Sequence, residues 1–243
     1  IACTFSAGKW IGVDSTSVAW ASHFFGVIAA DFLGGGPHVD PAVTLSMWAL
    51  GKCSYTDAFV RTSAQMGGGL VAFPLFFALS KALGLAEFGG PEFHMDEAED
   101  HPVEAFLSET VATFLLLILI YVVNWELNFG SYHYIIKQSL TAIGIRALIE
   151  FFPITGPAMN PMLATAWAVF GVGTKYVYPD DIEHYFVYWV GPYIAAILAS
   201  VAYGIYSGNP VFGAKLPLGP IKKQAPEKAP DTKEADKETK KDK

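Results

Sequence analysis

Charged residues are scarce in this sequence. Of its 243 residues, 16% are Asp, Glu, Lys or Arg and 52% are hydrophobic, and the mean hydropathy is +0.35. A soluble domain of this length carries about 25% charged residues. The shortfall indicates that lipid, and not water, is the solvent for most of the protein surface.

Cysteine is also nearly absent, and the familiar motifs of catalysis are missing. Cys3 and Cys53 are the two cysteines. The topology derived below puts them on opposite sides of a membrane, which excludes a disulfide, and both are interpreted as small apolar residues. The sequence has no metal-ligand spacing, phosphate-binding loop or nucleophile motif. We therefore expect no metal, no cofactor, no nucleic-acid partner and no enzymatic activity.

Long apolar runs are what the sequence does contain. Roughly 20 helical residues cross the hydrocarbon core of a bilayer, which is about 30 Å thick. Five stretches reach that length: 15–33, 57–80, 104–123, 137–155 and 184–206. The clearest part, 111–123, carries no charge. The sequence therefore predicts an all-α membrane protein embedded in a lipid bilayer.

The few charges predict its orientation. Nine Lys and six acidic residues lie in 214–243, which is interpreted as a disordered tail. Positive charge is retained on the cytosolic side of membranes, so this tail is expected to be cytosolic. Threading the spans back from it puts Lys52, Arg61 and Lys137 on the same side and the acidic stretch 87–104 on the other.

An internal repeat is the most informative pattern in the chain. GPHVDP at 36–41 recurs as GPAMNP at 156–161, 120 residues further on. Each copy opens a short apolar stretch, at about 40–50 and 160–171, half a membrane thickness long. Asp40 and Asn160 suit the N-cap of a helix, and the Pro that follows each suits its first turn. Paired half-helices predict inverted repeats whose helix N-termini meet near the membrane midplane.

The order and spacing of these motifs resemble the aquaporin, or major intrinsic protein, family. The resemblance is carried by GPHVDPAVTL at 36–45, by Glu109 and Thr113, and by ITGPAMNP at 154–161. It implies six spans and two re-entrant half-helices. Five full spans are found, so a first span is expected upstream of residue 1. The expected parts are a lead-in at 1–14, a channel domain at 15–213 and the tail at 214–243.

The resemblance also implies which residues line a pore. The paired motif corresponds to Asp40, Pro41 and Ala42 in the first half and to Asn160, Pro161 and Met162 in the second. The selectivity filter corresponds to Trp20, Leu148 and Leu163. His38 and Glu109 correspond to structural positions. Leu163 stands where the family has an Arg. An apolar filter lacks hydrogen-bond donors and predicts slow water flux or a dewetted gate. Lipid-shielded packing is the alternative role for each filter residue.

Four acidic or basic residues in or near the spans have two interpretations each. Ionisable groups at membrane depth are functional hypotheses by default. Arg146 and Glu150, however, are four residues apart and could simply pair, while Asp31 could face a vestibule. Asp40 replaces the amide of the family motif: an ionised carboxylate only accepts hydrogen bonds and would weaken cation exclusion, whereas a neutral one could donate.

Within the family, the chain looks most like the unorthodox branch, the small basic intrinsic proteins and superaquaporins of intracellular membranes. TGPAMNP at 155–161, YFVYW at 185–189 and the Lys-rich tail carry this likeness. KKDK at 240–243 resembles a dilysine retrieval signal for the endoplasmic reticulum; a merely solvating tail is the alternative.

The expected function is passive transport of water or a small uncharged solute by a homotetramer, with the tail available to a protein partner. A poorly conducting structural subunit is the alternative, and a leak for protons or cations is a third hypothesis.

Overall fold

The computed structural model describes residues 15–84, 93–170 and 178–222, and within these ranges the regular elements are helices apart from one β-bridge between Val211 and Ala214. Three of the described helices are long and apolar enough to cross a membrane: Thr16–Gly34, Pro102–Glu126 and Ile182–Ser207. The predicted all-α class is therefore confirmed. The expected lead-in at 1–14 and most of the tail at 214–243 lie outside the described residues.

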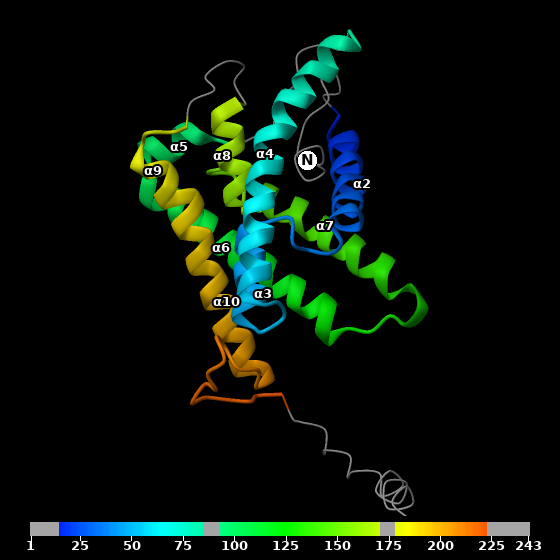
Figure 1. Ribbon diagram of the computed structural model, residues 1–243, viewed down its shortest axis with the longest axis vertical. Coiled ribbons are helices and arrows are strands. Elements are labelled where there is room, and N and C mark those ends of the chain that lie inside the picture. The colour runs from blue at the N-terminus through cyan, green and yellow to red at the C-terminus, as the bar shows by residue number, and fades with distance from the viewer. Residues whose placement is uncertain (1–14, 85–92, 171–177, 223–243) are drawn as a thin grey trace, which may run out of the picture.

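Figure 1 shows the arrangement of the described helices. In chain order they are α2 (Thr16–Gly34), α3 (Pro41–Ala49), α4 (Tyr55–Ala82), α5 (Met95–Asp100), α6 (Pro102–Tyr121), η1 (Val122–Glu126), η2 (Gly130–Tyr132), α7 (His133–Phe151), α8 (Pro161–Phe170), α9 (Ile182–Tyr185), η3 (Phe186–Val190) and α10 (Gly191–Ser207). The predicted spans at 57–80 and 137–155 overlap α4 and α7, which are 28 and 19 residues long but less apolar than the three above. The number of five full spans stays a prediction.

The two halves of the chain are paired crosswise. The short helix α3 packs against α10, and the short helix α8 packs against α4, while α2 contacts α7 and α3 contacts α8. α8 begins 120 residues after α3, so the two short helices are the equivalent elements of the two halves. The contact of α3 with α10 therefore corresponds to the contact of α8 with α4. Figure 1 shows α3 in the lower half of the molecule and α8 in the upper half. This exchange is the arrangement that inverted repeats produce.

Local chemistry explains where the two short helices begin. The carboxylate of Asp40 accepts the backbone N–H of Ala42 at 2.7 Å, and the amide oxygen of Asn160 accepts the N–H of Leu163 at 3.2 Å. Side-chain acceptors at this position satisfy N–H groups that have no partner within the helix. The short helix α3 ends before Gly51, whose φ of 67° lies in the left-handed region that favours glycine.

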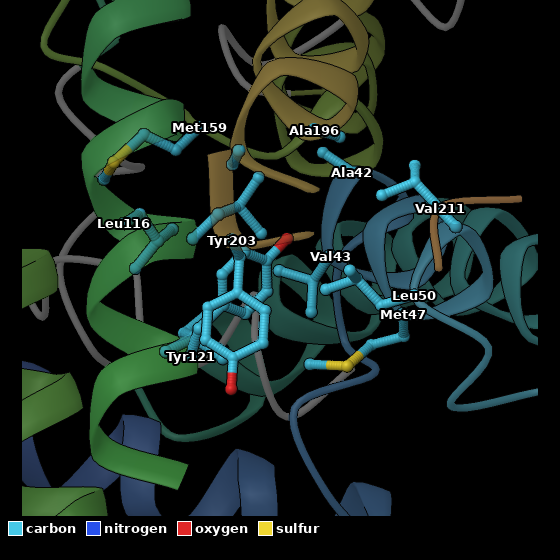
Figure 2. Packing of buried hydrophobic residues seen from close by; sticks show 14 of the residues in the cluster. Ala42, Val43, Met47, Leu50, Leu116, Tyr121, Met159, Ala196, Tyr203 and Val211 are labelled. Atoms are coloured by element: carbon cyan, nitrogen blue, oxygen red, sulfur yellow. The ribbon is translucent and has the colours of Figure 1, made fainter. Parts of the chain in front are cut away.

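A buried apolar cluster fixes the first short helix against two long ones. Val43 and Met47 of α3 meet Leu116 and Tyr121 of α6 and Tyr203 of α10 (Figure 2). The rings of Tyr121 and Tyr203 have their centroids 5.2 Å apart. Because aromatic rings bury large areas and pack in few geometries, this cluster determines where α3 lies relative to α6 and α10.

The chain beyond α10 folds back over the end of α3. The backbone N–H of Phe212 donates to the carbonyl of Ala49 at 2.7 Å, and its ring packs against Trp48 with centroids 5.1 Å apart. Further on, the ammonium of Lys222 lies 2.6 Å from a carboxylate oxygen of Glu126. This hydrogen bond raises the pKa of Lys222 above its ordinary value. The segment is thus tied to both α3 and η1.

The outer surface of the long helices is apolar. Phe25 and Phe32 on α2 are 67% and 72% exposed, and Leu107 on α6 and Leu198 on α10 are more than half exposed. Large apolar side chains in this number on the outside of neighbouring helices are unfavourable in water but suit contact with lipid tails. The surface therefore agrees with a protein embedded in a bilayer.

Gly69 marks the close approach of α4 and α8, and it yields a test of that packing. A Cβ added there would overlap the sulfur of Met162 and lie 3.2 Å from the Cβ of Ala166. We expect Gly69→Val to lower the melting temperature in detergent by several degrees, since overpacking costs about 1–3 kcal/mol. The matched control is Gly67→Val, whose Cβ would meet nothing within 4 Å. Equal melting temperatures for the two variants would contradict the packing.

Candidate functional site

A cavity of about 130 Å³ lies between the beginnings of the two short helices. Residues of α2, α3, α6, α7 and α8 line it, together with the segments that lead into α3 and α8. A water molecule occupies about 30 Å³ of liquid, so the cavity has room for only a few molecules of that size. Its walls are mostly apolar and carry a small number of polar side chains.

The two N-cap residues line this cavity from opposite halves of the chain. Asp40 and Asn160 are each 5% exposed. The amide nitrogen of Asn160 donates to the backbone carbonyl of Val39 at 3.2 Å, so it links the second half to the first. The two caps differ chemically, because an amide both donates and accepts whereas an ionised carboxylate only accepts.

Glu109 holds the approach to the second short helix. This residue of α6 is fully buried, and its two carboxylate oxygens accept the backbone N–H groups of Ala158 at 2.8 Å and of Met159 at 2.9 Å. Met159 has a φ of 51°, which is unusual for a residue other than glycine. The carboxylate therefore stabilises a strained bend directly before Asn160.

Gln65 of α4 holds the approach to the first short helix. Its amide nitrogen donates to the backbone carbonyl of His38 at 2.7 Å and to the hydroxyl of Thr44 at 2.9 Å. His38 is half-buried, with Nδ1 3.4 Å from the same hydroxyl. His38 and Ala158 are 120 residues apart and so occupy equivalent positions of the repeat. In each half a side chain therefore binds the backbone at this position, two residues before the cap. Sequence reasoning assigned no role to Gln65.

The predicted motif and filter residues occupy different surroundings. Pro41, Ala42, Pro161 and Met162 are buried at the starts of α3 and α8. Of the predicted filter, Leu163 lines the cavity. Leu148 packs instead against the apolar cluster of α3, α6 and α10. The indole nitrogen of Trp20 donates to Glu150 at 2.7 Å, and Trp20 is not among the described residues that line the cavity.

Several polar residues of the cavity wall were not predicted to lie there. His23 on α2 and Gln138 and Thr141 on α7 line it, and the one sequence signal for them is a polar side chain inside an apolar span. Asp31 and Arg146 line it as well. Arg146 also pairs with Glu150 at 3.1 Å, so both interpretations of Arg146, as a partner of Glu150 and as a group facing the interior, hold together.

Comparison with known proteins agrees with this architecture. A model of the major intrinsic protein family matches residues 3–203. The chain belongs to this family. Among its relatives, Aquaporin TIP2-3 of Arabidopsis thaliana is 28% identical over 194 residues, which are 79% of this chain and 72% of that protein. Aquaporin TIP1-2 of Zea mays is 30% identical over 195 residues, 80% of this chain and 71% of that one.

Membership in the major intrinsic protein family makes the chain an integral membrane protein of a channel family and not an enzyme. Probable aquaporin TIP-type alpha of Phaseolus vulgaris, 28% identical over 82% of this chain and 71% of that protein, is of the same TIP type as the relatives above. The predicted family is thus confirmed, and the assignment to the unorthodox branch stays a prediction.

Proposed function

We propose that this protein is an aquaporin-like channel for the passive transport of water or small uncharged solutes. The observation that carries the proposal is the small cavity bounded by the caps of two opposed short helices, Asp40 and Asn160, in a chain of the major intrinsic protein family. The N-termini of both helices lie at this cavity. Their partial positive charges disfavour cations there, while a neutral molecule meets no such barrier.

The motifs around the cavity set the expected transport properties. Asp40-Pro41-Ala42 and Asn160-Pro161-Met162 are atypical for the family, and the second is followed by Leu163 in place of a charged residue. Leu163 lines the cavity, as do Ile145 and Ile149 of α7, which supports a largely apolar wall. Such a wall offers no hydrogen-bond donors to a molecule that loses its hydration water on entry. We therefore propose slow water flux, with the apolar filter centred on Leu163.

Osmotic flux tests this function directly. Proteoliposomes that contain the full-length protein are expected to shrink faster than empty liposomes in stopped-flow light scattering. We expect Asp40→Asn to raise water flux several-fold, because an amide always offers a donor whereas a carboxyl group offers one only when it is protonated. Asp96→Asn, at an exposed position on α5, is the matched control and should leave flux unchanged. The transport function would be refuted if the wild type and Asp40→Asn both gave the same flux as empty liposomes for every neutral solute.

A poorly conducting structural subunit is the second candidate. It is favoured by one observation: the amide nitrogen of Asn160 binds the carbonyl of Val39, a contact that ties the two halves together across the cavity. A channel that keeps its fold but closes at this contact would show native stability without flux. The same flux measurement, with the melting temperature beside it, separates this candidate from an unfolded preparation.

We also propose a cytosolic C-terminus, assembly as a homotetramer and residence in an intracellular membrane such as the endoplasmic reticulum, as in the unorthodox branch. The excess of Lys in 214–243 supports the orientation. KKDK at 240–243, outside the described residues, supports the location and leaves the tail available to a protein partner. Replacement of Lys240 and Lys241 by Ser should move a tagged protein out of the endoplasmic reticulum in fluorescence microscopy. Unchanged location would contradict the retrieval signal.

A further inference from the structure

The helices α2 and α7 lie side by side and run in opposite directions, so the wall that they form has two ends (Figure 1). At one end the indole N–H of Trp20 donates to Glu150 at 2.7 Å. At the other end the hydroxyl of Tyr134 donates to a carboxylate oxygen of Asp31 at 3.3 Å. Asp31 lies in the last turn of α2, about 16 Å along the helix from Trp20. The two polar contacts therefore mark opposite ends of this wall.

Gln138 of α7 lies at the Asp31 end and on the side of the cavity. It follows Tyr134 by one helical turn, about 6 Å, and it lines the cavity together with Asp31. Apart from Arg146, the α7 residues that line the cavity recur at steps of three or four residues: Gln138, Thr141, Ile145 and Ile149. Residues at these steps share one face of a helix. This face of α7 is therefore the one that lies against the cavity.

The side-chain amide of Gln138 has no protein partner. The residue is 4% exposed, yet its amide forms no hydrogen bond with the residues that the structure describes. Neither amide atom is completely enclosed by protein, in contrast to the unpartnered Oε1 of Gln65. Buried polar groups without a partner are rare, because an unsatisfied donor or acceptor in the interior is unfavourable. The amide of Gln138 is thus available to a molecule in the cavity that it lines.

Asp31 offers a second group with free hydrogen-bonding capacity. The residue is 9% exposed, and Tyr134 binds its Oδ1, whereas Oδ2 has no partner within the described part of the chain and is not enclosed. A buried carboxyl group with one long hydrogen bond in a mostly apolar wall is unfavourable, and the donors of a bound molecule offset that cost. A carboxylate accepts hydrogen bonds, and an amide both donates and accepts them. Asp31 and Gln138 together therefore suit a molecule that does both.

We propose that Asp31 and Gln138 form a binding site for the permeating solute at the Tyr134 end of the cavity. The site takes a neutral molecule with at least two hydrogen-bond donors and an acceptor, such as a small polyol. One hydroxyl group donates to Oδ2 of Asp31, and another accepts from the amide of Gln138. Such a molecule reproduces the hydrogen bonds of the separate waters that it displaces and releases them to the solvent. The inference rests on the proposed channel function and assigns that function a solute class and a site.

The test measures binding of glycerol to the full-length protein in detergent, as the rise of the melting temperature with glycerol concentration. A ligand that binds the folded protein alone stabilises it in this way. Osmolytes also stabilise proteins by exclusion from the surface, but that part is shared by the wild type and the variants. We expect Gln138→Met and Asp31→Leu to bind glycerol about two- to tenfold more weakly, the effect of one lost hydrogen bond. Ser139→Ala, on α7 but not lining the cavity, is the control and should bind like the wild type.

Glycerol flux, measured in proteoliposomes beside the binding, separates this inference from the function. A larger effect of glycerol on the melting temperature of the wild type than on that of Gln138→Met supports the site, even if the wild type shows no flux and the proposed function fails. Equal effects on the wild type, Gln138→Met and Asp31→Leu overturn the inference, even if the wild type conducts glycerol. If Gln138→Met does not fold, Gln138→Glu carries the test with the same expected result, because it keeps the shape and loses the amide donor.

Discussion

Glu109→Leu is expected to lower the free energy of unfolding by about 2–6 kcal/mol, because it leaves two buried backbone N–H groups unsatisfied at about 1–3 kcal/mol each. The groups are those of Ala158 and Met159, which the carboxylate binds at 2.8 and 2.9 Å. Whole domains are stable by only about 5–15 kcal/mol. The variant should therefore yield little monodisperse protein in detergent and melt far below the wild type.

Two further substitutions make this expectation specific to the hydrogen bonds. Glu109→Gln keeps the shape and one acceptor oxygen, so it should retain one of the two bonds and lose about half as much stability. Glu104→Gln, at an exposed position on the same helix, should leave the melting temperature unchanged. A melting temperature of Glu109→Leu equal to that of Glu104→Gln would show that the approach to α8 holds without the carboxylate.

Glu109 and Gln65 differ because the backbone groups that they bind differ: one side chain accepts hydrogen bonds and the other donates them. At Ala158 and Met159 the group to be satisfied is an N–H, which needs an acceptor, and a carboxylate provides two. At His38 the group is a carbonyl, which needs a donor, and the amide of Gln65 provides one. The sequence shows both residue types at their positions, but not which backbone group each would meet.

The fold class could be predicted because its signals are long and repeated. Apolar runs such as 104–123 and 184–206 leave few alternatives to a membrane helix, and the 120-residue repeat of a capped Pro predicts two related short helices. The family model and the all-helical architecture of the described residues agree with this. The number of full spans has a weaker signal, since α4 and α7 contain polar and charged residues that lower their mean hydropathy.

The filter was harder to predict because a helix turns by about 100° at each residue. Leu148 was assigned to the filter by its likeness to the family pattern; it packs on the apolar cluster, as does its neighbour Ile149, which also lines the cavity. The place of His23 in the cavity wall was not predicted for a different reason: it depends on where α2 and α7 meet, which no local pattern reveals.

Asn160→Asp is expected to have the second largest effect among these substitutions. It removes the donor that binds the carbonyl of Val39 at 3.2 Å, a loss of about 0.5–1.5 kcal/mol for a typical hydrogen bond. It also brings a second carboxylate to the cavity that Asp40 lines, and like charges in a buried site destabilise each other. Both the melting temperature and neutral flux should fall well below those of the wild type.

The exchange Asp40→Asn with Asn160→Asp distinguishes charge repulsion from general damage. It restores one carboxylate and one amide at the two caps that line the cavity. We expect the double variant to recover at least about 1 kcal/mol relative to the sum of the single variants, the size of coupling found between residues in contact. Additive losses in a double-mutant cycle would mean that the caps do not interact across the cavity, and that each half-helix is stabilised by its own segment alone.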